Sequence, residues 1–219
     1  MTSTAAPTAD VPLSTLLRTG SQQEHRDAEG SAFMAELTAG RVSREGYAHY
    51  LGCLRRVYAA LESVGRDLRD DPVAGPVVDP ALERLAAIEA DLAAWGGDPR
   101  AASAATDAYV ARIEATRAWG GLYVAHHYTR YLGDLSGGQV IGRALTREYD
   151  LAPGEGIAFY RFEAVPKPKP YKDAYRAALD ALPLDTTQRD RVLDEVRVVF
   201  GLNGALFAEL SELLPQYRR

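Results

Sequence analysis

The sequence is very poor in cysteine, and this absence limits the chemistry open to it. Cys53 is the only cysteine among 219 residues, which excludes an internal disulfide, a CxxC redox pair and a thiolate-rich metal cluster. Cys53 lies within a helical pattern, where we expect a small buried apolar residue. The sequence also lacks an HExxH motif, a GxSxG elbow and a phosphate-binding loop, so nothing in it supports a zinc or di-iron site or a serine hydrolase.

Long apolar runs and strong charge of one sign are missing as well. The net charge of −5 argues against nucleic acid as the main partner. No stretch has the apolar length of a membrane helix, and the first residues lack the basic start and apolar run of a signal peptide. We therefore expect a cytoplasmic protein without a membrane anchor. Residues 1–10 are expected to be a disordered tail, 11–215 a single domain and 216–219 a short C-terminal tail.

Strand signals are nearly absent, whereas helical periodicity recurs along the chain. Polar residues at helix starts and glycines at helix ends divide this pattern into segments. The predicted segments are a first helix from Leu13 to about Ala28, a short helix capped by Ser31, a long helix from Ser43 to Leu68, helices after Asp79-Pro80 and Asp98-Pro99, one from Lys169 to Leu182, and a last helix opened by a capping box of Asp185 and Gln188. The fold class is therefore all-α, a single-domain bundle of roughly eight helices.

The stretch from Leu122 to Leu145 combines a helical pattern with an internal run of glycines at positions 133, 137, 138 and 142. Each interior glycine costs a helix about 1 kcal/mol relative to alanine. Two interpretations are open: a continuous helix with a kink or a close backbone approach, and a loop between two short helices. The unbroken aromatic and basic pattern on both sides favours the kinked helix.

Histidines and basic residues are the candidate site residues. His25 precedes Glu29 by one helical turn, a spacing that suits a metal ligand oriented by a carboxylate, although an ordinary surface pair has the same spacing. His126 and His127 are adjacent, so they point about 100° apart and cannot share a metal. Lys172 lies one turn before Arg176, beside tyrosines.

Such cations suit a planar, partly apolar anion with carboxylates, although a solvated helix face is the common alternative. Arg130 lies one turn before Asp134 in the same way. Asn203 interrupts the apolar stripe of the last helix, and a polar residue on a buried face needs a partner.

The string from Tyr128 to Gly138, YTRYLGDLSGG, is very similar to the signature of the haem oxygenases. The resemblance extends over most of the chain in the expected order, with a weak match only between Asp67 and Val110. The supporting segments are His25 to Glu29 with Phe33-Met34, Arg44 to Tyr47, Tyr58 to Glu62, Tyr171 to Arg176, and Phe200 to Asn203.

The resemblance implies a fold in which haem lies between the first, proximal helix and a glycine-kinked distal helix. It implies oxidative cleavage of haem b, which is both cofactor and substrate, by O2 and reducing equivalents. The products would be biliverdin (the α isomer), CO and ferrous iron, formed through a ferric hydroperoxide. Electrons would come from a ferredoxin or a flavin reductase system, and the enzyme, expected to be a monomer, would serve iron acquisition or haem turnover. The rival interpretations are a carrier or sensor that binds haem without degrading it, and a helical interaction module.

The resemblance also implies a role for individual residues. His25 would ligate the haem iron, with Glu29 as the partner of its other ring nitrogen. Asp134, with Tyr58 and Arg130, would hold a distal water network for proton delivery. The remaining assignments are Gly133 and Gly137 on the porphyrin face; Tyr128, Ser136 and Gly138 as further haem contacts; Arg18, Lys172 and Arg176 on the propionates; and Phe200 and Asn203 in the pocket lining. His127 departs from the pattern, because a small residue is expected there.

Overall fold

The computed structural model describes residues 11–101, 103–152 and 154–219, and its regular secondary structure is helical. The helices are α1 (Leu13–Gly20), α2 (Gln22–Glu29), α3 (Ala32–Thr38), α4 (Arg44–Asp67), α5 (Leu85–Trp95), α6 (Ala104–Ala115), α7 (Gly120–Gly133), α8 (Gln139–Glu148), α9 (Pro168–Asp180) and α10 (Thr186–Glu212). Within those described ranges there is no strand, only a single antiparallel bridge between Val42 and Arg218. The predicted all-α class is confirmed.

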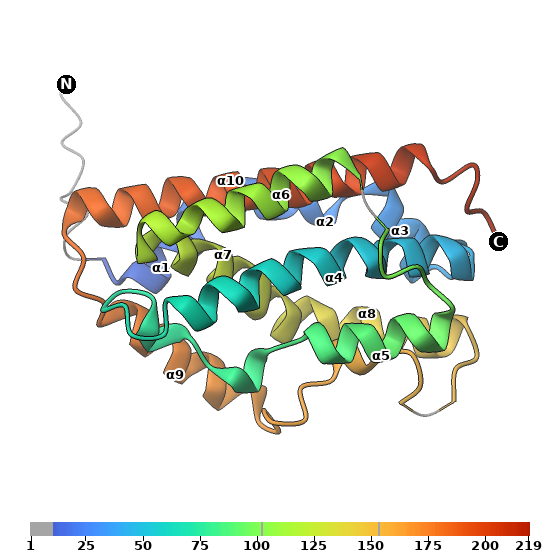
Figure 1. Ribbon diagram of the computed structural model, residues 1–219, viewed down its shortest axis with the longest axis horizontal. Coiled ribbons are helices and arrows are strands. Elements are labelled where there is room, and N and C mark those ends of the chain that lie inside the picture. The colour runs from blue at the N-terminus through green and yellow to red at the C-terminus, as the bar shows by residue number, and fades with distance from the viewer. Residues whose placement is uncertain (1–10, 102, 153) are drawn as a thin grey trace.

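The two longest helices, α4 and α10, run along the length of the molecule, and α6 packs against both of them (Figure 1). Helix α7 packs along α10, and α5 packs along α4. Tyrosines form much of the core between these helices. The fully buried ones are Tyr47, Tyr58, Tyr109, Tyr123 and Tyr131. Among them, the Tyr58 hydroxyl is hydrogen-bonded to Asp134 and Arg130, and this polar group within the core belongs to the candidate site.

Three helix starts lie where a local signal in the sequence predicts them. The Ser31 side chain accepts a hydrogen bond from the Met34 amide and caps α3. Ser43 caps α4 in the same way. Asp185 and Gln188 form the predicted reciprocal capping box at the start of α10. These starts are local because the capping atoms lie within three residues of the amides they satisfy.

The prediction of one first helix to about Ala28 is wrong, because the chain breaks at Ser21. Helix α1 ends at Gly20, and α2 begins at Gln22. Ser21 adopts a non-helical φ of −120° and donates its hydroxyl to the Leu17 carbonyl. A Cβ added to Gly20 would lie 2.7 Å from Leu193 of α10. A side chain at position 20 would require Leu193 to shift, and the Ser21 side chain competes with the backbone at the break.

The predicted N-cap at Asp98 is also wrong. Asp98 accepts from the Arg100 amide in a turn, and Ser103 caps α6 instead. Asp79 does cap a helix, but that helix is the single 3₁₀ turn from Pro80 to Leu82.

Helix α5 begins later than the sequence signal indicates, at Leu85. One carboxylate oxygen of Glu62 accepts from both the Arg84 and Leu85 amides there. Since Glu62 lies on α4, no local pattern could have shown this start.

The stretch from Leu122 to Leu145 stays helical across its glycine run. Helix α7 ends at Gly133, a π-helical segment spans Asp134–Gly138, and α8 continues from Gln139. We call α7, this segment and α8 together the distal helix. A π-helical segment inside an α-helix is rare and occurs often at functional sites. Because the backbone is helical from Gly120 to Glu148, the loop interpretation is excluded. The π-helical segment lies at the position predicted for the kink.

The structure describes the C-terminal residues but not the first ten. The predicted tail 1–10 lies outside the residues that the structure describes. At the other end, the Tyr217 carbonyl accepts from the Ser43 amide at 2.6 Å, and the Tyr217 hydroxyl lies 2.7 Å from His49 Nδ1. Within the described ranges, no helix has the length and apolar character to cross a membrane.

Candidate functional site

A cavity of about 900 Å³ opens between the N-terminal helices, the distal helix and α10. This volume is in the range of about 300–1,000 Å³ that is common for small-molecule sites. Most of the predicted site residues line it: Arg18, His25, Tyr128, Arg130, Gly133, Asp134, Ser136, Gly137, Gly138, Arg176, Phe200 and Asn203. The structure thus brings together residues from α1, α2, α7, the π-helical segment, α9 and α10.

The glycines of the distal helix fall into two groups. A Cβ added to Gly133 or Gly137 would meet no atom within 4 Å, and both residues line the cavity. A Cβ added to Gly138 would lie 3.2 Å from the ring of Tyr160, and one added to Gly142 would lie 3.0 Å from the Cβ of Tyr160. The first group leaves the cavity wall bare where a flat ligand could lie directly on the backbone. The second group lets the helix pack closely on Tyr160.

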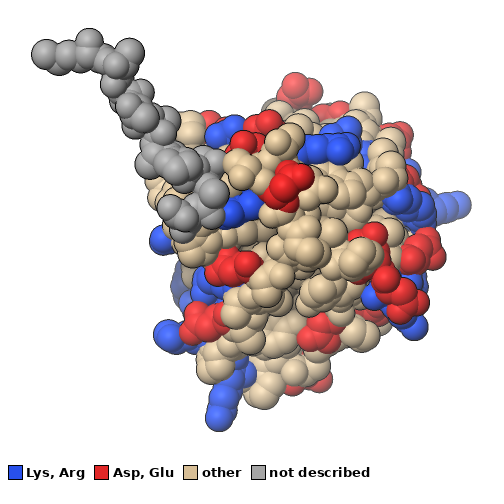
Figure 2. Space-filling model, turned by 90° about the vertical axis from the view of Figure 1, so that its left-hand side faces the viewer, with Lys and Arg blue, Asp and Glu red and all other residues tan. Residues whose placement is uncertain are grey.

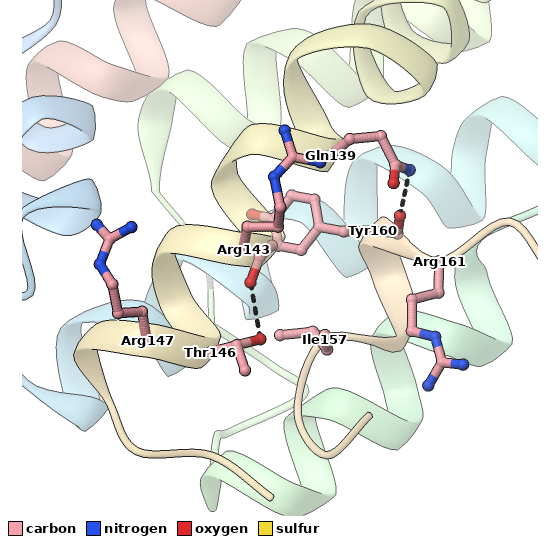
Figure 3. A pocket seen from close by; sticks show the side chains of 8 residues that line it. Gln139, Arg143, Thr146, Arg147, Ile157, Tyr160 and Arg161 are labelled. Carbon is pink, nitrogen blue, oxygen red and sulfur yellow. Dashed lines mark hydrogen bonds between the residues drawn. The ribbon is translucent and has the colours of Figure 1, made fainter. Parts of the chain in front are cut away.

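Tyr160 belongs to the segment that supports the distal helix from behind. Figure 3 shows this region, where Gln139 of α8 donates to the Tyr160 carbonyl at 2.7 Å. The Thr146 hydroxyl donates to the Gly142 carbonyl at 2.9 Å. A small cavity of about 280 Å³ lies here beside Arg143 and Arg161. These contacts fix the back of α8 and therefore the position of the glycine wall.

His25 reaches the cavity from α2, and its ring packs edge to face against Phe200 of α10, with centroids 5.6 Å apart. Glu29 ends the same helix, but its side chain lies outside the part of the chain that the structure describes, so its predicted pairing with His25 stays a prediction. Among the described residues there is no cluster of three or more His, Cys, Asp or Glu side chains that could hold a metal ion. A metal in this cavity would therefore arrive with its own additional ligands, as the iron of a macrocycle does.

A buried polar network surrounds Asp134 on the cavity wall. The Tyr58 hydroxyl donates to Asp134 Oδ2 and accepts from Arg130 Nε and Nη2 at 3.0 and 2.9 Å. Arg130 Nη2 also lies 3.7 Å from Asp134 Oδ1. Burial raises the pKa of the Asp134 carboxyl above its ordinary value, and the charge of Arg130 and the hydrogen bond from Tyr58 oppose part of that rise. Tyr58 does not itself line the cavity, but it connects Asp134 to Arg130.

Asn203 completes this network from α10. Its Oδ1 accepts from Arg130 Nη1 at 2.8 Å, and both side chains are buried. The prediction that Asn203 needs a polar partner is confirmed. Because Arg130 is held by groups on α4 and α10, its charge is fixed beside Asp134 within a region of low dielectric constant.

Arg18 and Arg176 form the cationic edge of the cavity around Tyr128. Burial raises the pKa of the Tyr128 hydroxyl, and the charges of Arg176 and Arg18 counteract part of this rise, which places both near it. Lys172 does not line the cavity; its ammonium donates to the Ser136 hydroxyl at 3.0 Å. The proposed clamp thus has two cations in the cavity wall and a third bound to the π-helical segment.

Sequence reasoning missed several lining residues, among them Thr129, Leu132 and Phe207. Helical spacing contained the signal for them. Thr129 lies one turn before Gly133 on α7, and Phe207 lies one turn after Asn203 on α10, so each shares a face with a predicted site residue. Extending each predicted residue by one turn along its helix would have found them.

His126 and His127, whose spacing indicated only that they cannot share a metal, do not line the cavity. His126 Nε2 lies 3.0 Å from Glu195 on α10, and His127 Nδ1 lies 2.7 Å from the Tyr175 hydroxyl on α9. Both histidines are buried. Their contacts join α7 to two other helices.

The surface at one end of the molecule carries charges of both signs. Figure 2 shows Lys and Arg mixed with Asp and Glu around a largely uncharged centre on that face. No extended patch of one sign is visible on this view.

The comparisons with known proteins agree on one family. The family model described as Heme oxygenase matches residues 11–209. Human heme oxygenase 1 is 40% identical over 210 residues, covering 92% of this chain and 73% of that protein. The crystal structure of Synechocystis heme oxygenase-1 in complex with heme superposes with a TM-score of 0.88 at 36% identity, covering 94% of this chain and 95% of that one. The heme oxygenase of Leptospira interrogans superposes with a TM-score of 0.86 at 35% identity, covering 91% and 100%.

The chain belongs to the haem oxygenase family. Members of the haem oxygenase family are haem-degrading enzymes, so the predicted family and enzyme class are confirmed. The residues that line the cavity also fit a haem, independently of these similarities. It offers a bare glycine wall for a flat macrocycle, a histidine for an axial position, and two arginines for carboxylates.

Proposed function

We propose that this chain binds haem b in the 900 Å³ cavity with His25 as the iron ligand, and that it cleaves the α-meso position with O2. Biliverdin, CO and ferrous iron would be the products. The observation that carries the proposal is the meeting of His25, a bare glycine wall and the buried Asp134 network at one cavity. No single one of these features would suffice.

The substrate itself supplies the redox-active iron at which O2 is reduced. The protein contributes binding, orientation and proton delivery. His25 would hold the iron through a neutral imidazole, which would donate less electron density than a thiolate and would therefore favour O–O cleavage less strongly. The edge contact with Phe200 limits rotation of the imidazole ring.

Gly133 and Gly137 would let the distal helix lie directly on the macrocycle. Since a Cβ at either position would occupy open cavity, the missing side chains leave room for O2 and little else. This confinement would direct the bound O2 toward one edge of the macrocycle. Regioselective oxidation requires such confinement, because the meso carbons of the ring are chemically similar.

Asp134 would deliver protons through water at the distal face. Tyr58 occupies Oδ2 as a donor, which leaves Oδ1 to bind a water molecule. Because burial raises the pKa of this carboxyl, it holds a proton more readily than a surface aspartate. Arg130 would fix the orientation of Tyr58 and thereby of the carboxylate.

Arg18 and Arg176 would bind the haem propionates and fix the in-plane orientation of the substrate. Lys172 would join them if its ammonium exchanges Ser136 for a propionate. The α isomer follows from this orientation as the expected product. Electrons would come from a separate ferredoxin or flavin reductase, and the enzyme is expected to act as a monomer in iron acquisition or haem turnover.

The ligand assignment is tested by His25→Ala. We expect haemin to bind with an altered Soret maximum and turnover to stop, because the axial ligand is lost. Added imidazole should partly restore the original Soret maximum and the turnover. His49→Ala is the control, because His49 also packs edge to face on an aromatic ring but contacts Tyr217 away from the cavity. Full turnover of His25→Ala without imidazole would refute the assignment.

A further inference from the structure

Helix α9 carries Arg176 into the cavity and is tied to its neighbours by a few polar contacts. Asp180 accepts from the Ser14 amide and hydroxyl on α1, at 2.7 and 3.0 Å. Tyr171 donates to Asp79 at 2.6 Å. The third contact joins Tyr175 to His127 of α7. The ion pair between Arg176 and Asp173 lies within α9, so it moves with the helix and cannot fix its place.

The contact between His127 and Tyr175 is short and buried. The Tyr175 hydroxyl lies 2.7 Å from His127 Nδ1, and the two rings are nearly parallel, with an angle of 4° between them. Their exposed fractions are 2% and 5%. Burial lowers the pKa of His127 to about 3, so the imidazole stays neutral and this hydrogen bond is constant across physiological pH.

This contact lies where the two helices reach the cavity. Tyr175 directly precedes Arg176, and His127 directly precedes Tyr128, the residue whose hydroxyl lies near the charges of Arg176 and Arg18. Loss of this contact would therefore let α9 move relative to α7 and would change the position of Arg176 relative to Tyr128. The Lys172–Ser136 contact nearby is solvent-exposed, so it resists such a shift less than a buried hydrogen bond does.

We propose that His127 and Tyr175 form a positioning pair that sets which meso carbon is attacked, by fixing Arg176 relative to the distal helix. The proposal rests on the proposed function, in which Arg176 binds a propionate. Neither side chain touches the substrate; the pair acts through the place of Arg176. His127 stands immediately before the segment that resembles the family signature, so the signature itself gives it no role.

The test compares Tyr175→Phe, His127→Ala and the double variant with the unmodified enzyme. Tyr175→Phe removes one hydroxyl and keeps the ring, so its fold should survive. Three quantities are measured: the biliverdin isomers by chromatography, the Kd for haemin, and the Tm. His49→Ala is the matched control, because it removes a histidine–tyrosine hydrogen bond of the same 2.7 Å length, made to Tyr217 away from the cavity.

We expect each single variant to produce a second biliverdin isomer, because Arg176 is no longer held in place. The Kd for haemin should rise about 5-fold, which corresponds to the loss of one hydrogen bond from Arg176 to a propionate. The double variant should have the same isomer composition and the same Kd for haemin as His127→Ala, because both substitutions break the same contact. His49→Ala should lower the Tm without changing isomer or Kd.

Two outcomes would overturn the proposal. If Tyr175→Phe and His127→Ala lower the Tm but keep a single isomer and the original Kd, the pair is only structural. If the unmodified enzyme yields no biliverdin, the proposed function fails first and the positioning role fails with it. The two failures are distinguishable, because only the second affects the unmodified enzyme.

Discussion

At the scale of residues, the proposed proton delivery depends on Asp134. Its carboxylate is buried, bonded to Tyr58 on one oxygen and close to Arg130 on the other. A buried carboxylate is costly unless it is paired, and the structure supplies both a cation and a hydroxyl donor. The arrangement therefore holds one buried, paired carboxylate beside glycines that lack side chains.

Replacing Asp134 with Ala or Asn tests its role in proton delivery. Neither variant should lose haem, since the cations and His25 are intact, but we expect biliverdin yield per haem to fall at least about 10-fold, in line with the loss of a positioned proton donor. The yield is measured in a single turnover by absorption. Asp107→Asn, a change at an exposed carboxylate paired with Arg56, should behave as the unmodified enzyme. A normal yield from both Asp134 variants would exclude the relay.

Some residue contacts could be predicted from the sequence and others could not. Asn203 was predictable, because a polar side chain in an apolar stripe requires a partner, and Arg130 is that partner. The bond from Lys172 to Ser136 was not predictable, since it depends on how closely α9 approaches the π-helical segment. The contact of His127 with Tyr175 likewise joins residues of two helices, and no local pattern in the sequence links them.

At the scale of elements, the distal helix combines bare and packed glycines. The wall formed by Gly133 and Gly137 opens on the cavity, whereas Gly138 and Gly142 pack on Tyr160. The cost of glycine in a helix is thus accepted for two different reasons, space for a ligand and close packing of a neighbour.

Replacing Gly133 with Ala should separate stability from function. Since its added Cβ meets no atom, we expect the haem-free protein to gain roughly 0.5–1 kcal/mol in free energy of unfolding, while haemin affinity or turnover falls. Gly201→Ala is the matched control: its Cβ also meets open space on α10, and Gly201 does not line the cavity. Urea unfolding without haem and steady-state kinetics measure the two effects. Equal haemin affinity and equal turnover of both variants would contradict a haem contact at Gly133.

Element boundaries were predictable where their cause is local. Ser31, Ser43 and Asp185 cap amides within three residues, so the sequence contained their signals. The break at Ser21 depends on contact of Gly20 with α10. The start of α5 depends on Glu62 of another helix. Tertiary contacts decided these two boundaries, and a single-sequence pattern does not contain them.

At the scale of the whole molecule, Glu195 joins three helices. From α10 its carboxylate accepts hydrogen bonds from Arg112 of α6 and His126 of α7. Burial alone would raise the pKa of Glu195, but these hydrogen bonds outweigh burial and hold it at about 2, below the ordinary value of 4.5. A carboxyl whose pKa is lower in the folded state stabilises that state at pH values above its unfolded-state pKa. This stabilisation is lost as the pH falls through its folded-state pKa.

The corresponding prediction concerns the difference in free energy of unfolding between the unmodified protein and Glu195→Gln. At pH 7 the variant should have the lower free energy of unfolding. The difference should shrink as the pH falls from about 4.5 toward 2, because Glu195 becomes protonated and loses its charge. Urea unfolding at several pH values measures it. A difference that stays constant over this interval would show that the charge of Glu195 does not stabilise the assembly of the three helices.

The measurement that tests the central claim most directly is a single turnover of bound haem. The protein is loaded with haemin and supplied with a reductant and O2, and the Soret band and biliverdin absorption are followed together. The account predicts that the Soret band decays while biliverdin forms in equal amount, with CO released, and that chromatography shows the α isomer. A persistent Soret band without biliverdin would contradict it and would identify a haem carrier instead.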